Sequence, residues 1–320
     1  MHALDSGYLF DAKHENGMQI FGGRTPVPIR VEDKLITLVV GCYEQKNRTA
    51  IGLLKIEVEE LSCGKLNFAT HSLKYPYIKR GEKGTYSEWG IIPSCALTDE
   101  NGGVLLYTIG FDSRNSHIFD ASSGICKLNR NLEVKEIPKG PVLERGLDDP
   151  YWAASPFVIQ LVEKNEYAML YTSAIELSDD CGAASKEHHK YIIKARHSCD
   201  PYYFNPRADV IVEPGNPGEY AIARPSVLHL NHHYYLFYCK RETARSDDYM
   251  IFYRKAKKIS ELKNSSEQPL QIDVSHASFN TCQCYPYPLV YKDRVLIFYN
   301  GIEYGKTGFR IAVLSRMDLK

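Results

Sequence analysis

Five related stretches recur along this chain of 320 residues, and each is built around a proline that opens a short apolar run. The prolines are Pro26, Pro93, Pro156, Pro225 and Pro288, which are spaced 63 to 69 residues apart. Self-similarity at a nearly fixed period indicates an architecture in which one supersecondary unit recurs. Since the five units account for nearly the whole chain, this repetition constrains the fold more than any other feature.

Each unit follows the same internal plan. A short apolar strand follows the proline, a polar tip such as "TDENGG" or "EKNE" comes next, and an alternating strand such as "YYLFYCK" follows the tip. A third strand, such as "YMIFYRKAKK", appears further on. The tips have the composition of hairpin turns, and no stretch carries a long apolar pattern with a 3.6-residue period. We therefore expect very little helix, and the 23 tyrosines also favour strands.

Three or four short strands per unit, repeated five times, predict an all-β fold, a five-bladed β-propeller. We expect one domain over residues 1–320, with blades that begin near residues 22, 88, 149, 219 and 280. A large β-sandwich with coincidental spacing is the alternative, but proline position, register and strand plan repeat together. The pattern leaves open whether residues 1–20 close the ring or lie apart from it.

Composition and charge exclude several classes of function. The chain has 39 basic and 39 acidic residues, so no basic field exists to attract a nucleic acid. It has no 18-residue apolar run, so we expect no membrane span. The start lacks the basic and apolar regions of a secretory signal, and the nine cysteines are odd in number and scattered. They are interpreted as reduced thiols, and we expect a cytoplasmic protein.

Carboxylates precede three consecutive repeats. In a propeller the first strand of each blade lines the central channel, so the loops before these strands converge on one axial funnel pocket. Glu88, Asp149 and Glu219 should meet there. Carboxylates that share a partly buried pocket shift each other's pKa and can act as general acid and general base, the pair that glycosidic bond cleavage needs. We predict these three residues as catalytic.

Each carboxylate also has a structural interpretation. Glu219 could form an ion pair with Arg224 in the channel wall. Asp149, which precedes Pro150, could make an Asx-type turn, and Glu88 could cap a turn or lie in solvent.

Aromatic and basic residues in the same loops predict a carbohydrate site. Exposed aromatic rings stack on the apolar faces of sugars, and arginines bind anionic groups in bidentate fashion. The predicted substrate-binding residues are Arg24, Arg48, Trp89, Trp152, Arg224, Arg241 and Asn300. Alternatively, the two tryptophans pack between blades, and Arg24 and Arg224 are ion-pair partners in the channel wall.

The stretches "DDPYWAASPFVI", "EYAIARPSVL" and "YNGIEYGKTGFRIAVL" resemble bacterial proteins related to glycoside hydrolase family 43, over about Gly22 to Leu314. The resemblance implies a five-bladed propeller. In the better-known enzymes of that family an Asp of the first blade is the base, a second Asp tunes proton affinity and a Glu is the acid, and arabinose or xylose is released with inversion. By this resemblance Glu219 matches the acid and Asp149 matches the tuning Asp or the base. Arg24 stands at the first-blade entrance, where this chain has no acid.

The resemblance extends to other ligands. Related propellers include mannoside phosphorylases with a basic phosphate site, which Arg24, Arg48, Arg224 and Arg241 could supply. Other relatives belong with surface-polysaccharide biosynthesis, which implies a nucleotide sugar or an anionic sugar. The resemblance also allows a calcium ion at the funnel base. The chain has no loop of oxygen ligands, and the "CQC" pair has no second pair, so we predict neither a metal nor a cofactor.

Two hypotheses of different class follow. The first is an enzyme that acts on a glycosidic bond, a hydrolase or a phosphorylase, with Glu219 as acid and Asp149 or Glu88 as base. The second is a propeller that binds a sugar or nucleotide sugar without cleaving it. Two carboxylates that face one cavity, one of them buried, would support catalysis, whereas carboxylates each locked to an arginine would support binding or scaffolding.

Overall fold

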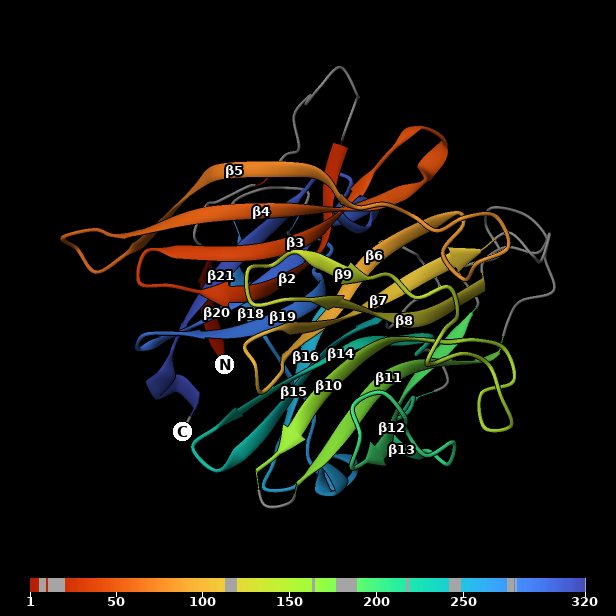
Figure 1. Cartoon of the computed structure of the whole chain (residues 1–320). Coiled ribbons are helices and arrows are strands. Elements are labelled where there is room, and N and C mark those ends of the chain that lie inside the picture. The colour runs from red at the N-terminus through yellow and green to blue at the C-terminus, as the bar shows by residue number, and fades with distance from the viewer. Residues whose placement is uncertain are drawn as a thin grey trace.

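A computed structural model gives the structure of the chain. It describes residues 1–5, 10, 21–112, 120–162, 165–176, 189–216, 219–241, 249–274, 279 and 281–319, without the side chains of residues 21, 317 and 318. Nearly all regular structure in these ranges is β-strand, as Figure 1 shows. The expectations of an all-β chain and of little helix are confirmed.

The strands form five successive antiparallel meanders, numbered here in chain order. Meander 1 contains β2 (Phe21–Val31), β3 (Leu35–Tyr43), β4 (Thr49–Glu60) and β5 (Leu66–Ile78). Meander 2 contains β6 (Gly90–Thr98), β7 (Val104–Asp112), β8 (Asp120–Leu128) and β9 (Val134–Glu136). Meander 3 contains β10 (Ala153–Leu161), β11 (Glu166–Glu176), β12 (Lys190–Ser198) and β13 (Asp209–Val212).

The last two meanders complete the chain. Meander 4 contains β14 (Ala221–Leu230), β15 (His233–Arg241), β16 (Met250–Ala256) and β17 (Gln268–Pro269). Meander 5 contains β19 (Cys284–Tyr291), β20 (Arg294–Asn300), β21 (Phe309–Ser315), the N-terminal β1 (His2–Asp5) and, parallel to β1, β18 (Gln271–Asp273). The short 3₁₀ helices are η1 (Gln45–Asn47), η3 (Ile259–Asn264), η4 (Ile302–Gly305) and η5 (Arg316–Leu319).

The first strands of the meanders contact one another in a cyclic order. The strand β2 contacts β6, β6 contacts β10, β10 contacts β14, β14 contacts β19, and β19 contacts β2. Single parallel bridges, Thr49 to Gly90 and Tyr191 to Ala221, link meander 1 to meander 2 and meander 3 to meander 4. The first strands therefore lie together at the centre, and the later strands lie further out.

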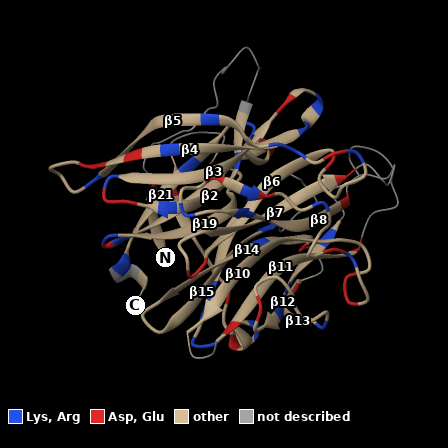
Figure 2. Ribbon diagram, viewed as in Figure 1, with Lys and Arg blue, Asp and Glu red and all other residues tan. Residues whose placement is uncertain are grey.

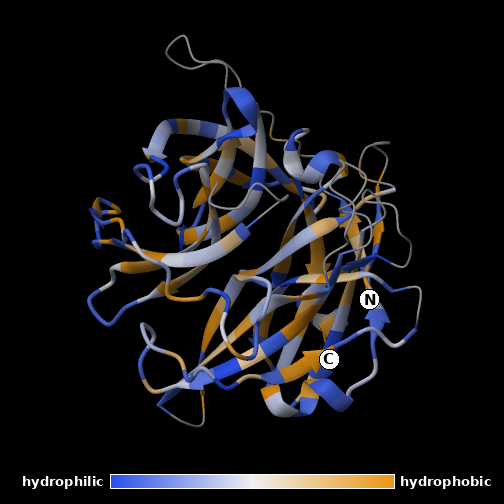
Figure 3. Ribbon diagram, turned by 90° about the vertical axis from the view of Figure 1, so that its right-hand side faces the viewer, coloured by the Kyte–Doolittle hydropathy of each residue, from blue (hydrophilic) through white to orange (hydrophobic). Residues whose placement is uncertain are grey.

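The apolar core lies between neighbouring meanders. Leu54 of meander 1 packs in one cluster with Phe298 of meander 5, for example, and Leu228 of meander 4 packs with Ile297 of meander 5. Similar clusters join meanders 1 and 2, and meanders 2, 3 and 4. Figure 3 shows hydrophobic residues along the strands and hydrophilic ones at many of the turns. Burial between sheets, rather than within one layer, accounts for the near-continuous apolar runs of the second strands.

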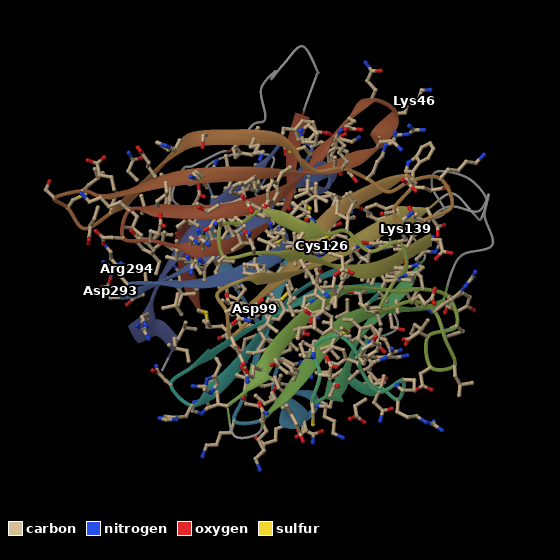
Figure 4. The ribbon with its side chains drawn as sticks, in the orientation of Figure 1. Lys46, Asp99, Cys126, Lys139, Asp293 and Arg294 are labelled. Atoms are coloured by element: carbon tan, nitrogen blue, oxygen red, sulfur yellow. The ribbon has the colours of Figure 1, made fainter. Side chains whose placement is uncertain are left out.

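The two ends of the sheets carry different connections. In Figure 4, Asp99 and Asp293 lie in the hairpin turns that follow two first strands, on the left of the view. Lys46, in the turn between β3 and β4, and Lys139, in the connection that leads to β10, lie on the right. Basic and acidic residues are both scattered over the ribbon in Figure 2, and the formal net charge is zero.

Every first strand has a β-bulge near its start. In four of them the bulged residue has a left-handed backbone and precedes a proline: Thr25 (φ 51°), Ser155 (φ 59°), Arg224 (φ 58°) and Tyr285 (φ 58°). In β6 the ladder shifts between Pro93 and Cys95. A bulge re-aims a side chain, and a left-handed non-glycine residue persists only where its surroundings enforce it. The bulges turn the side chains of Thr25, Arg224 and Tyr285 toward other first strands.

The bulges correct the register of the fifth repeat. Cys284 pairs with Asn300 and Tyr287 pairs with Phe298, so the bulge falls at Tyr285 and the equivalent proline is Pro286. The alignment on Pro288 was wrong by two residues, since Pro288 lies in the regular ladder opposite Ile297. The stretch "YPYP" contains both prolines, and a two-residue shift preserves the alternation of faces, so the pattern could not separate them.

Asn300 joins meander 5 to meander 1. Its Oδ1 accepts a hydrogen bond from Thr25 N (2.8 Å), and its Nδ2 donates to Gly23 O and Gly308 O (both 2.8 Å). The side chain is fully buried. Gly305, with φ +97°, approaches so closely that an added Cβ would lie 2.7 Å from Asn300 Nδ2. This junction and the pairing of His2–Asp5 with β21 connect the two ends of the described chain.

We predict that Asn300→Leu lowers the free energy of unfolding by about 3 kcal/mol, because three buried backbone groups lose their only side-chain partner. Urea denaturation followed by fluorescence measures the change. Asn101→Ala, an exposed turn position, is the matched control and should change stability by no more than about 0.5 kcal/mol. Equal stability of N300L and wild type would contradict a joining role for Asn300.

Candidate ligand-binding site

Arg224 lies at the centre of the first strands. Its guanidinium donates to Ser94 Oγ (3.3 Å) and Pro93 O (3.4 Å) of β6, and its backbone N–H donates to Thr172 Oγ1 (2.9 Å) of β11. The side chain is 8% exposed. A residue of meander 4 thus reaches meander 2, because the bulge and left-handed backbone at Arg224 turn its side chain inward.

Arg24 lies beside it. Its guanidinium donates to Tyr285 Oη (3.3 Å), and its Cζ lies 5.5 Å from the Tyr285 ring and 5.6 Å from the Phe111 ring. The Cζ of Arg224 lies 5.3 Å from the centroid of the same Tyr285 ring. The Nε of Arg24 is buried without a hydrogen-bond partner, yet the side chain as a whole is partly exposed. Tyr285 therefore contacts both guanidiniums.

No carboxylate in the described part of the chain lies within ion-pair distance of Arg24 or Arg224. Burial lowers the pKa of Arg224 to about 10, and the positive charge of Arg24 acts in the same direction. Both side chains remain charged at neutral pH. None of the five first strands contains Asp or Glu, so the described residues of the centre leave this positive charge uncompensated.

Tyrosines surround the two arginines at the start of the first strands. Tyr304 stacks on Tyr285 with ring centroids 6.0 Å apart and meets the edge of Tyr249 at 6.1 Å. The buried Arg241 lies with its Cζ 5.5 Å from the Tyr249 ring. Sequence reasoning did not select Tyr249, Tyr285 or Tyr304 as site residues. The position of Tyr285 directly before Pro286, as Arg224 stands before Pro225, was the available signal.

The two tryptophans differ in environment. Trp152 is buried and packs on Tyr191 at 4.8 Å between centroids, which fits the packing alternative. Trp89 is 39% exposed, and the Cζ of Arg48 lies 4.9 Å from its ring centroid. Trp89 is thus the tryptophan that a ligand can reach.

Asp149 is fully buried and has three side-chain partners. Its Oδ1 accepts from Lys194 Nζ (3.0 Å), and its Oδ2 accepts from Arg196 (2.6 Å) and Tyr171 Oη (2.9 Å). Burial opposes ionisation, but these donors outweigh it and hold the pKa of Asp149 below its usual 3.8. The partners come from β11 and β12, so the carboxylate belongs to the interior of meander 3, and the geometry favours a structural role.

Glu219 is 8% exposed and also has a cationic partner. The ion-pair alternative named Arg224, but the structure places Lys240 Nζ 3.1 Å from Glu219 Oε1, and Lys240 also pairs with Glu267. Gly215 N donates to Glu219 Oε2 at 2.7 Å. Burial raises the pKa of Glu219, but these bonds outweigh that effect and lower it below 4.5. A lowered pKa keeps the carboxylate ionised at neutral pH, whereas a general acid must hold a proton.

Glu88 and Asn300 have local roles. The Oε2 of Glu88 accepts from Gly84 N, as the turn-capping alternative expects, and Trp89 N donates to Phe111 O at 2.9 Å. Asn300 uses both amide hydrogens at the junction of meanders 5 and 1. The catalytic assignments of Glu88, Asp149 and Glu219 stay predictions, since no observed contact tests them, and the structure does not bring the three carboxylates into one hydrogen-bonded cluster.

A tyrosine, an arginine and a carboxylate recur together in three meanders. Tyr171, Arg196 and Asp149 form the cluster in meander 3. Similar sets are Tyr238, Arg254 and Glu267 in meander 4, and Tyr299, Arg310 and Asp5 in meander 5. The arginines of meanders 3 and 4 occupy matching ladder positions, whereas Arg310 lies directly opposite Tyr299. Recurrence of one polar cluster at related positions indicates a shared structural function, because a catalytic group is needed only once.

The described residues contain no group of three His, Cys, Asp or Glu side chains that could hold a metal ion. They include no helix that is long and apolar enough to cross a membrane. A cavity of about 460 Å³ lies between meanders 1 and 2, where Arg30, Lys55, Lys74 and Tyr77 are among its lining residues, and neither Arg24 nor Arg224 lines it. The axial pocket expected from the sequence stays a prediction.

Solved structures with a similar fold act on carbohydrates. A thermostable family-43 glycoside hydrolase aligns with a TM-score of 0.60 and 13% identity over 92% of this chain and 89% of that one. An exo-1,5-alpha-L-arabinanase from a bovine ruminal metagenomic library aligns with a TM-score of 0.61 and 12% identity, over 94% of this chain and 95% of that one. Bacillus subtilis levansucrase in complex with oligosaccharides aligns with a TM-score of 0.63 and 11% identity, over 97% of this chain and 87% of that one. At such identities the likeness shows the fold alone, which is that of the glycosidase propellers.

Two sequence relatives come from Mycobacterium tuberculosis. They are named Uncharacterized protein MT1551 and Uncharacterized protein Rv1502, and each is 23% identical over 292 residues, which cover 91% of this chain and 91% of the relative. No family model matches the chain.

We predict that Asp149→Asn lowers the free energy of unfolding at pH 7 by about 3 kcal/mol, because Lys194 and Arg196 lose their buried counter-charge. The folded-state pKa of Asp149 lies below 3.8, so the carboxylate stabilises the fold above the unfolded-state pKa, and this contribution disappears as pH falls through the folded-state value. Urea denaturation between pH 7 and pH 3 should show the difference between wild type and variant shrinking in acid.

Asp209→Asn, at an exposed position, is the control for a change of net charge alone and should alter stability by no more than about 0.5 kcal/mol. A D149N protein as stable as wild type at pH 7 would remove the argument that this ion cluster holds meander 3 together.

Proposed function

We propose that this chain is a five-bladed β-propeller that binds an anionic carbohydrate at the arginines where its first strands meet. The cyclic contacts among β2, β6, β10, β14 and β19 support five blades in one domain over residues 1–320, beginning near residues 22, 88, 149, 219 and 280. The strand β1 supports closure, because it adds the N-terminus to meander 5 through its pairing with β21.

One observation carries the anionic part of the proposal. Arg24 and Arg224 lie together on first strands that contain no carboxylate, and both contact Tyr285. Two like charges in a partly buried site repel each other and resist desolvation, which makes a bound anion favourable. The exposed part of Arg24 offers donors to such an anion, and arginine donors bind carboxylate and phosphate oxygens well.

The carbohydrate part rests on the aromatic residues and on the neighbours. Tyr285, Tyr304 and Trp89 are partly exposed rings near the arginines, and rings of this kind stack on sugars. The levansucrase neighbour, which has the same fold, is in complex with oligosaccharides. A nucleotide sugar or an acidic polysaccharide unit combines a sugar with the negative charge that the arginines require.

Glycosidic bond cleavage is the second candidate, favoured by the glycosidase fold of the neighbours. It would use Glu219 as acid with Asp149 or Glu88 as base. The lowered pKa values of Glu219 and Asp149 oppose this, since each carboxylate is held ionised by a lysine. A ligand that displaced Lys240 from Glu219 would be needed to raise that pKa.

We predict that calorimetry detects binding of acidic sugars, such as galacturonate, but not of neutral arabino- or xylo-oligosaccharides. Arg24→Gln should weaken the binding of the acidic sugar by about tenfold or more, since a charge-assisted hydrogen bond is lost. Raising the salt concentration should weaken binding to wild type further. Arg207→Gln, on an exposed loop, should leave the affinity unchanged. Equal affinity for neutral and acidic sugars would contradict the proposal.

The variant Glu219→Gln separates binding from cleavage, because the amide keeps the size of the side chain but cannot donate an acid proton. For a binding protein we expect no release of free sugar by either protein, and retained binding by the variant. Sugar release by wild type that disappears in E219Q, while binding persists, would instead establish Glu219 as the acid. Chromatography of the incubated ligand measures the release, and thermal unfolding of E219Q verifies that it folds.

A further inference from the structure

We propose that the binding site extends outward from Arg24 to a ring platform formed by Trp89 on Arg48. The ligand then has a ring unit joined to its anionic sugar: an acidic saccharide of two or more units, or a nucleotide sugar. This inference rests on the proposed function, because it takes Arg24 as the anchor of the anionic group. It adds a second subsite to the proposed function and therefore implies a ligand with more than one unit.

The platform is a partly exposed ring with a guanidinium packed on it. Arg48 Cζ lies 4.9 Å from the Trp89 ring centroid, while 39% of Trp89 is exposed. The Nε of Arg48 is buried without a hydrogen-bond partner, so stacking on the ring is the contact that orients this guanidinium. An indole held flat in this way presents a face to the apolar side of a sugar or to a nucleobase.

A close approach of two backbones fixes the platform. Thr49 and Gly90, the residues after Arg48 and Trp89, form the parallel bridge between meanders 1 and 2. A Cβ added to Gly90 would lie 2.4 Å from Thr49 Oγ1, so only glycine fits there. Because the backbone positions are set by the fold, the ring is ordered before a ligand arrives, which reduces the entropy lost on binding.

One residue, Phe111, links the platform to the anchor. Trp89 N donates to Phe111 O at 2.9 Å, and Arg24 Cζ lies 5.6 Å from the Phe111 ring. Gly90 pairs with Phe111 in the ladder between β6 and β7. Trp89 and Arg24 are thus both neighbours of Phe111 without contacting each other in any observed interaction. We therefore infer a ligand with one unit for each of these side chains, an anionic unit at Arg24 and a ring unit at Trp89.

Calorimetry with galacturonate, digalacturonate and UDP-glucose tests the second subsite. Wild type should bind at least one of the two longer ligands about tenfold more tightly than galacturonate, and the ligand that gains affinity identifies the ring unit. Trp89→Ala should remove that gain and leave galacturonate within about twofold of wild type. Arg24→Gln should weaken all the acidic ligands. In wild type, the longer ligand should also change the tryptophan fluorescence, and Trp89→Phe should abolish this change.

Tyr203→Ala is the matched control, since Tyr203 is 77% exposed and lies on meander 3. Thermal unfolding should show that W89A folds like wild type. If W89A binds the longer ligand as tightly as wild type, Trp89 is not a second subsite. If W89A loses as much affinity for galacturonate as for the longer ligand, Trp89 does not act on a separate ring unit. Either result would overturn the platform. Failure of wild type to bind any of the three ligands would instead overturn the proposed function itself.

Discussion

The structure depends on the convergence of five first strands. Five strands that meet at one centre leave little room for large side chains. The bulges at their starts turn side chains toward other first strands, so that these side chains can hydrogen-bond across the centre. Thr25 Oγ1 donates to Pro93 O at 2.9 Å, and Ser94 Oγ donates to Pro156 O at 2.8 Å, so small hydroxyl residues connect one first strand to the next. Where the bulged residue is Arg224 or Tyr285, the side chain is long enough to cross between meanders that are not adjacent in the sequence.

This arrangement separates two kinds of charge. The buried carboxylates Asp149 and Glu219 are neutralised within their own meanders by lysines and arginines of the second and third strands. The arginines of the first strands have no such partner among the described residues. Burial of an unpaired charge costs several kcal/mol, so a fold that retains two of them close together sacrifices stability at that point. Such a sacrifice is typical of a functional site.

The sequence predicted the fold through features that are local. Repeated prolines, polar tips and alternating strands depend on neighbouring residues, and they indicated five units and an all-β chain. The charge partners were not predictable in the same way. Lys194 and Arg196 follow Asp149 by more than forty residues, and only the pairing of β11 with β12 sets which side chains face the carboxylate. Likewise, "YPYP" does not reveal which tyrosine lies at the bulge, so Tyr285 was not selected although Arg224 was.

The recurrent cluster of tyrosine, arginine and carboxylate shows why residue type alone misleads in a repeat protein. An acid in the loop before a first strand has the position expected of a catalytic group, but in meander 3 it completes the same polar cluster that Glu267 completes in meander 4 and Asp5 in meander 5. These three acids come from different places in their repeats and reach equivalent partners. The fold therefore fixes the tyrosine opposite the bulge, takes its arginine from the third strand, and accepts a carboxylate from whichever segment passes nearby. What distinguishes the centre of the molecule is the reverse condition, a pair of arginines that no acid among the described residues neutralises, and in the proposed function a bound anion supplies the negative charge.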